Sequence, residues 1–145
     1  GYTISCAESC TGGLLTSTLT DVPGSSAYVM GSVVSYSNDV KSRILHVTEE
    51  TLSAHGAVSP ETARAMAEGV RTLMQTDIGV GITGIAGPGG GSPEKPVGLV
   101  YIAVSAPGKT SVEKNVFSGV RAEIKRAAVH KALAMVQEMI REMDK

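Results

Sequence analysis

Residues 2–20 read YTISCAESCTGGLLTSTLT, and this stretch predicts a strand, a tight turn and a helix in that order. The segment Tyr2–Ala7 is short, apolar and bounded by polar residues, which is typical of a buried strand. Thr11-Gly12-Gly13 then breaks the strand, and Leu14–Thr20 follows as a short helix. This strand–turn–helix unit is the first step of the alternation found in α/β proteins.

The alternation continues along the rest of the chain. Strands are predicted over Gly31–Tyr36 and Ile78–Thr83, and Val97–Ser105 and Val112–Phe117 flank Pro107-Gly108 as a hairpin. Helices are predicted from an Asn38 cap to Leu45, from Thr48 to about Gly56, from the start signal Ser59-Pro60-Glu61, and after Ser118. We therefore expect an α/β fold, a three-layer α/β/α sandwich whose five-stranded sheet is mostly parallel with one antiparallel strand.

Length and composition narrow the class of protein. The 145 residues predict one domain, residues 1–145, and a start at Gly1 without an initiator Met suggests an excised domain. Proteins that bind nucleic acid usually have a basic surface with aromatic rings that stack on bases. This chain has a net charge of −1 and only 3% aromatic residues, so nucleic acid is not an expected partner. No apolar run approaches the roughly 18 residues of a membrane span. The two cysteines suit a reducing compartment, and we expect a cytoplasmic location.

Four polar residues follow strands whose ends should share one edge of the sheet. Ser9, Tyr36 and Thr83 lie at the carboxyl ends of strands expected to be parallel, and Arg121 follows the last hairpin strand. Ligands of open α/β sheets bind at the carboxyl ends of the strands. The sequence therefore predicts a site at this edge.

Ser9 lies at a strand-to-helix turn, where the N–H groups around Thr11, Gly12 and Gly13 could hold an oxyanion or a phosphate. A plain helix cap and tight turn fit the same residues equally well. Cys10 is a rival nucleophile, but no histidine lies near it in sequence, and a buried packing role is the more common one. Lys41 could act as a base if burial lowered its pKa, although a solvated helix lysine is the usual case. The three histidines lack metal-ligand spacing, so no metal site is expected.

The glycine-rich run TGIAGPGGG, residues 83–91, is followed by a strand and not by the helix of a dinucleotide-binding motif. Long glycine-rich loops of this kind often line or close over a site. A simple hairpin connection is the alternative, but prolines stiffen the run. Arg121 stands at a helix start, which is unfavourable for a cation unless it binds an anion. An ordinary surface arginine is the other interpretation.

Taken in this order, the motifs resemble the C-terminal domain of the CinA (competence/damage-inducible) family, known as nicotinamide-nucleotide amidase. The resemblance covers nearly the whole chain. It rests on seven ordered blocks: AESCTGG (7–13), PGSS (23–26), YSN (36–38) with Lys41, GAVS (56–59), TGIAGP (83–88), KPVG (95–98), and FSG (117–119) with Arg121.

The resemblance implies hydrolysis of nicotinamide mononucleotide to nicotinate mononucleotide and ammonia by a serine/lysine mechanism, without metal or cofactor. By position, Ser9 matches the nucleophile and Lys41 the base, with Tyr36 helping to orient the lysine. Ser26 and Thr83 match supporting polar groups, and Arg121 matches a substrate-binding cation. We also expect a homo-oligomer. Two other functions stay open: a non-catalytic nucleotide-binding regulatory module, or an oligomerisation module that uses the apolar stripe of the last helix.

Overall fold

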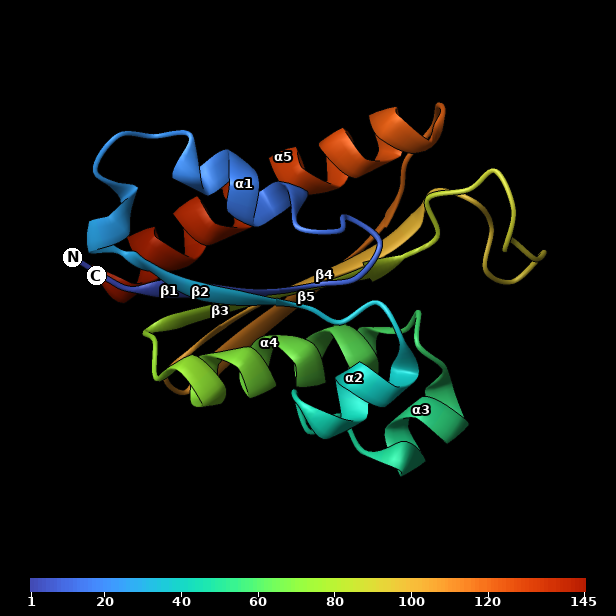
Figure 1. Ribbon diagram of the computed structural model, residues 1–145, viewed down its shortest axis with the longest axis horizontal. Helices are drawn as coiled ribbons and strands as arrows, with labels where there is room; N and C mark the ends of the chain where they lie inside the picture. The colour runs from blue at the N-terminus through green and yellow to red at the C-terminus, as the bar shows by residue number, and fades with distance from the viewer.

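The computed structural model describes residues 1–145 and places one five-stranded sheet between two layers of helices (Figure 1). The strands are β1 (Ile4–Glu8), β2 (Val29–Val34), β3 (Ile78–Gly84), β4 (Leu99–Ala106) and β5 (Lys109–Val116), in the order β2-β1-β3-β4-β5. β1 pairs in parallel with β2 and β3, and β4 is antiparallel to both of its neighbours. The predicted mostly parallel sheet with one antiparallel strand is confirmed.

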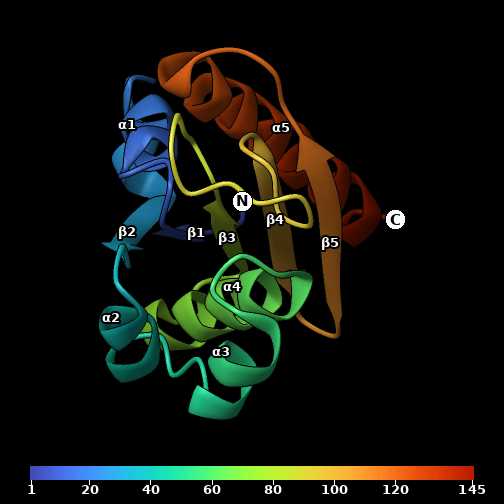
Figure 2. The ribbon, with the colours of Figure 1, turned by 90° about the vertical axis from the view of Figure 1, so that its right-hand side faces the viewer.

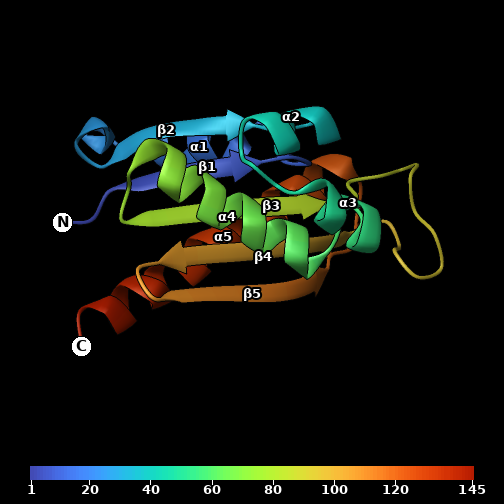
Figure 3. The same cartoon turned by 90° about the horizontal axis from the view of Figure 1, so that it is seen from below.

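The two helical layers come from different parts of the chain. α1 (Leu14–Thr20) and α5 (Arg121–Met143) cover one face of the sheet. α2 (Asn38–Arg43), α3 (Glu49–His55) and α4 (Pro60–Met74) lie on the other side (Figures 1 and 3). None of these helices combines the length and hydropathy that a bilayer crossing requires.

The apolar stripe of α5 belongs to the protein's own core. Ile124, Ala128, Met135 and Met139 are all buried and pack in the largest apolar cluster, together with β1, β3 and β4. The stripe is therefore not exposed to a second molecule, and the interpretation of this helix face as an oligomerisation surface is wrong.

On the opposite face, α4 packs unusually close to β3. A Cβ atom at Gly79 or Gly81 would collide with the carbonyl oxygen of Ala67 or Ala63, so only glycine permits this approach. The close packing holds the start of α4, and the turn before it, against the carboxyl end of β3.

Several element boundaries differ from the predicted ones. β1 extends through Glu8, and the cap of α2 is Ser37, whose hydroxyl accepts a hydrogen bond from Val40 N (3.2 Å). β5 begins at Lys109 because the two-residue turn Pro107-Gly108 pairs Ala106 directly with Lys109. Hydrogen bonding to β4 thus makes the polar residues at the start of β5 part of the strand, although the apolar pattern does not predict them there.

The carboxyl ends of β1, β2 and β3 meet at one edge of the sheet. Figure 2 looks onto this edge: the glycine loop, residues 85–98, passes in front of the sheet, with the start of α5 above it and α2 and α3 below. Segments that are far apart in the sequence therefore converge here.

Candidate active site

A cleft of about 270 Å³ opens at this edge of the sheet. Five of the residues singled out from the sequence line it: Ser9, Tyr36, Lys41, Thr83 and Arg121. The remaining lining residues are Cys10, Asn38, Ala57, Val58, Gly84, Ile85, Ala86, Gly87, Gly89 and Gly90. The predicted convergence of strand ends therefore produces one cleft.

Lys41 lies at the bottom of the cleft with its amine directed at Ser9. Nζ is 3.1 Å from Ser9 Oγ and also donates to the carbonyl oxygens of Ser35 (2.7 Å) and Tyr36 (3.3 Å). The residue is only 1% exposed, and burial lowers the pKa of its amine. No carboxylate forms an ion pair with it. The interpretation of Lys41 as a solvated helix lysine is therefore wrong.

This geometry suits a neutral amine. A neutral amine has two N–H groups, which match the two carbonyl oxygens of Ser35 and Tyr36, and one lone pair. The lone pair can then accept the hydroxyl proton of Ser9 across the 3.1 Å separation. The arrangement can activate a serine hydroxyl without a histidine.

Tyr36 contacts Lys41 through its backbone and not through its ring. The carbonyl oxygen helps to orient the amine, whereas the side chain is 64% exposed and its hydroxyl accepts a hydrogen bond from Arg121 Nη2 (3.2 Å). Arg121 Nη1 donates to Gly87 O (2.6 Å). The guanidinium thus links α5, the glycine loop and the segment after β2, and it retains further N–H donors for an anion.

Thr83 has a structural contact within the cleft wall. Its buried hydroxyl donates to Ala57 O (2.6 Å), which ties the end of β3 to the turn between α3 and α4. Ala57 and Val58 line the cleft. They belong to the GAVS block of the family resemblance, but neither side chain carries a chemical group that predicts this position, which depends on how α3 and α4 pack against the sheet.

Thr11, Gly12 and Gly13 do not line the cleft. The N–H of Gly12 closes a turn onto Ser9 O (3.0 Å), and the Thr11 hydroxyl donates to a carboxylate oxygen of Glu8 (2.6 Å). The predicted binding role of these three residues therefore has no geometric support from their position.

Glu8, the residue before Ser9, has a structural role that the sequence analysis did not predict. Its fully buried carboxylate accepts hydrogen bonds from the N–H groups of Leu15 and Thr16 (both 2.9 Å) and from the hydroxyls of Thr11 and Thr16. A carboxylate already occupies the N-terminus of α1, so this helix end is not open to a substrate anion. The available signal is an acid directly after a strand predicted to be buried, since a buried carboxylate needs several donors.

Ser26 lies far from the cleft. It is exposed in a 3₁₀ turn, Ser25–Ala27, which precedes β2. Because β1 and β2 are parallel, the start of β2 lies at the opposite end of the sheet from Ser9. Within one chain, Ser26 cannot reach the cleft.

Cys10 lines the cleft but is a poor nucleophile. Burial raises the pKa of its thiol to about 11, so the reactive thiolate is scarce at neutral pH. No group of three or more histidine, cysteine or acidic side chains is arranged to hold a metal ion. Among the groups of the cleft, Ser9 is therefore the better candidate for attack on a substrate.

Comparison with known proteins gives the family. The profile of the CinA C-terminal domain matches residues 1–140. The chain belongs to the CinA C-terminal domain family. A "Putative competence-damage inducible protein" of Caldanaerobacter subterraneus subsp. tengcongensis is 54% identical over 140 residues, which are 97% of this chain and 34% of that protein. A "CinA-like protein" of Gemmatimonas aurantiaca is 54% identical over 131 residues, 90% of this chain and 31% of the relative.

Solved structures of CinA proteins have the same fold. The competence/damage inducible protein CihA of Agrobacterium tumefaciens superposes with a TM-score of 0.94 at 46% identity, over 95% of this chain and 85% of that one. The competence damage-inducible protein A of Klebsiella pneumoniae gives a TM-score of 0.93 at 35% identity, over 97% and 87% of the two chains. This CinA domain spans about a third of the length of the curated relatives it matches.

Proposed function

We propose that this domain is a serine amidohydrolase that converts nicotinamide mononucleotide to nicotinate mononucleotide and ammonia. The observation that supports it best is the buried amine of Lys41, 3.1 Å from Ser9 Oγ and without a carboxylate partner. A nucleotide-binding module does not need a desolvated base beside a hydroxyl, whereas a serine nucleophile needs a neighbouring base to activate it.

The chemistry proceeds in two halves. Neutral Lys41 accepts the Ser9 proton while Oγ attacks the carboxamide carbon, and the resulting ammonium returns that proton to the departing nitrogen, which leaves as ammonia. A water molecule then attacks the acyl-enzyme ester. Lys41 takes the proton of this water and passes it to Ser9 Oγ as the acid product leaves. No metal or cofactor enters either half.

The tetrahedral oxygen needs hydrogen-bond donors. Glu8 fills the N-terminus of α1, which leaves the other backbone N–H groups of the cleft lining. No acceptor within the chain engages those of Cys10, Ala57, Val58, Ala86, Gly87, Gly89 and Gly90. The N–H of Cys10, directly after Ser9, and those of Ala86 and Gly87 in the glycine loop are candidates for this role.

Two arguments support this substrate, one from the residues of the cleft and one from the family resemblance. Arg121 supplies a cation with free donors near the glycine loop, which suits the phosphate of a mononucleotide. The nicotinamide carboxamide itself is inferred from the resemblance to nicotinamide-nucleotide amidases. A cytoplasmic location and self-association belong to the same proposal.

Ammonia release tests this function against that of a non-catalytic nucleotide-binding module. The wild-type domain should release ammonia from nicotinamide mononucleotide. Ser9→Ala should abolish release while still binding the nucleotide, and Cys10→Ala should remain active. A wild-type domain that binds the nucleotide without turnover would favour the regulatory module instead.

A further inference from the structure

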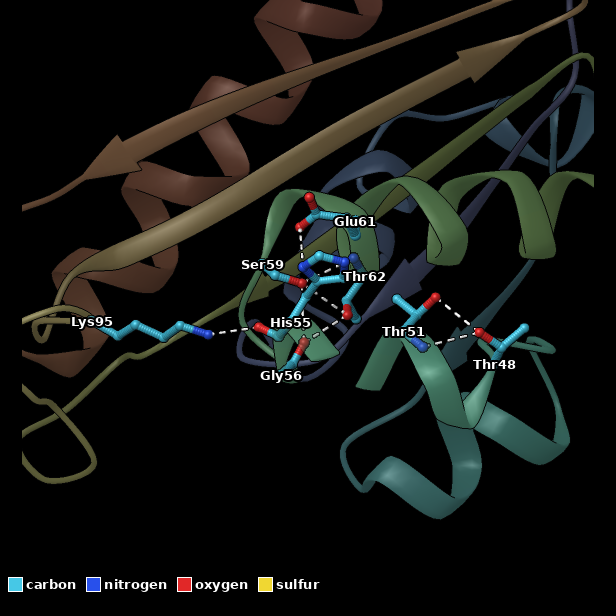
Figure 4. Close-up of polar contacts among 8 residues, drawn as sticks. All are labelled: Thr48, Thr51, His55, Gly56, Ser59, Glu61, Thr62 and Lys95. Carbon is cyan, nitrogen blue, oxygen red and sulfur yellow. Dashed lines mark hydrogen bonds and ion pairs between the residues drawn. The ribbon is translucent and has the colours of Figure 1, made fainter. Parts of the chain in front are cut away.

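Ala57 and Val58 form one wall of the cleft, and hydrogen bonds at three consecutive carbonyl groups, those of residues 55–57, hold this segment. His55 O accepts from Lys95 Nζ (2.8 Å). Gly56 O accepts from the hydroxyls of Ser59 (3.0 Å) and Thr62 (2.7 Å), and Ala57 O accepts from Thr83. Figure 4 shows the first two of these carbonyls and their donors.

Lys95 differs from the other donors in the part of the structure that carries it. The serine and threonines belong to α4 and β3, which pack in the body of the protein, whereas Lys95 lies on the returning arm of the glycine loop. Its hydrogen bond to His55 O is the one polar contact between this loop and the α3–α4 turn. The opposite arm of the loop contributes Gly89 and Gly90 to the cleft.

The loop is preorganised to present this lysine. At its base, Gly98 N donates to Ile85 O (2.8 Å). Near its tip, Ser92 and Lys95 close a turn through Ser92 N to Lys95 O (2.8 Å) and Lys95 N to Ser92 Oγ (3.1 Å). Between base and tip, Arg121 holds Gly87 O. One cation therefore fixes the loop to α5 and the other fixes it to α3, on the two sides of the cleft.

The position of the ammonium is also favourable. His55 is the last residue of α3, where the carbonyl groups carry the negative end of the helix dipole. Gly56 leaves room for the ammonium, since a Cβ at this position would lie 2.9 Å from Lys95 Nζ. A single partly exposed hydrogen bond contributes little to global stability. Its loss would therefore affect the loop and not the fold as a whole.

We propose that Lys95 is a positioning residue that holds the glycine loop closed across the cleft by bonding to the C-terminal end of α3. This proposal rests on the proposed function. Tight binding of the substrate then requires the closed loop. When a binding-competent state is populated for only a fraction of the time, the apparent affinity falls by that fraction. Once substrate is bound the loop is closed, so turnover at saturation is unaffected.

The test compares Lys95→Met, Lys95→Arg and the control Lys131→Met. Lys131→Met also removes one partly exposed lysine contact, the ion pair with Glu113 (3.0 Å), but on the α5–β5 side of the molecule. For Lys95→Met we expect the KM for nicotinamide mononucleotide to rise about tenfold with kcat within about twofold of wild type. Lys95→Arg should restore most of the affinity because it retains the cation, and Lys131→Met should match wild type.

Hydrogen exchange of the free protein provides a readout independent of activity. In Lys95→Met, amides of residues 85–98 should exchange faster than in wild type, while those of β1 and β3 should not change. Unchanged loop exchange, or faster exchange with an unchanged KM, would overturn the proposal. A Lys95→Met variant that loses both kcat and stability, without a change in exchange specific to the loop, would also overturn it. If wild type shows no amidase activity but the exchange difference is present, the proposed function fails and the loop contact stands.

Discussion

Replacement of Lys41 by arginine tests the base directly, because arginine is permanently protonated and cannot accept a proton. Arginine stays protonated at any pH the protein tolerates. Lys41 is almost completely buried, and its Nζ already has three neighbours within 3.3 Å. The larger guanidinium therefore has no room to keep all three contacts and still leave Ser9 free to react.

The expected loss follows from the role assigned to the amine. A positioned general base contributes about 10²- to 10⁴-fold to the rate, which corresponds to a barrier increase of roughly 3–5 kcal/mol. We expect kcat/KM of Lys41→Arg to fall by at least about a hundredfold in an ammonia-release assay. Lys131→Arg is the matched control because it makes the same exchange at a partly exposed ion pair.

The pH dependence has a defined sign. Burial lowers the pKa of Lys41 in the folded protein, so the neutral, active fraction increases as pH rises. Below that pKa, log kcat/KM should increase by about one for each pH unit, and it should level off above it. The unfolded chain binds more protons between the folded pKa and the normal lysine value, so the free energy of unfolding should also rise with pH across this window. Lys41→Met should remove that rise.

Two results would refute this reasoning. One is a folded Lys41→Arg variant that retains more than about a tenth of the wild-type kcat/KM, since a permanently protonated side chain cannot act as the base. The other is a wild-type kcat/KM that does not change with pH up to the ordinary pKa of lysine.

Two further predictions concern neighbouring groups. Arg121→Ala should reduce the preference for nicotinamide mononucleotide over nicotinamide riboside, measured as the ratio of the two kcat/KM values, by at least about thirtyfold. The reason is that an unpaired phosphate costs roughly 2–5 kcal/mol. An unchanged ratio in a folded variant would place the phosphate elsewhere. Glu8→Gln should lower the free energy of unfolding by about 2–4 kcal/mol in urea titrations, because an amide nitrogen would face donors that now reach a carboxylate. Glu94→Gln, at an exposed carboxylate, serves as its control. A loss below about 1 kcal/mol for Glu8→Gln would show that α1 does not depend on this cap.

Much of the fold could be predicted from local patterns. The strand–helix alternation and the start signal Ser59-Pro60 depend on neighbouring residues alone, and the structure contains α4 where that signal predicts it. The order of the elements also determines that Ser9 follows β1 and that Thr83 lies near the carboxyl end of β3, which pairs with β1 in parallel. Since the carboxyl ends of parallel strands share an edge, the sequence itself places these two residues in one region.

The chemistry of the site depends on contacts between distant segments. Whether Lys41 is solvated or buried is decided by the packing around α2, and its orientation by carbonyl groups that carry no residue-specific signal. The same is true of Lys95, which meets His55 from 40 residues away.

Glu8 and Ser26 show the limit of motif reasoning most clearly. Both lie in blocks that resemble the family, but the fold directs the Glu8 carboxylate into the end of α1 and leaves Ser26 at the far end of the sheet. Sequence patterns determine which elements form and in what order, because backbone preferences and apolar periodicity act over a few residues. Which polar atoms meet, and which of them lose water, depends on the relative placement of whole elements, and only the tertiary structure determines that.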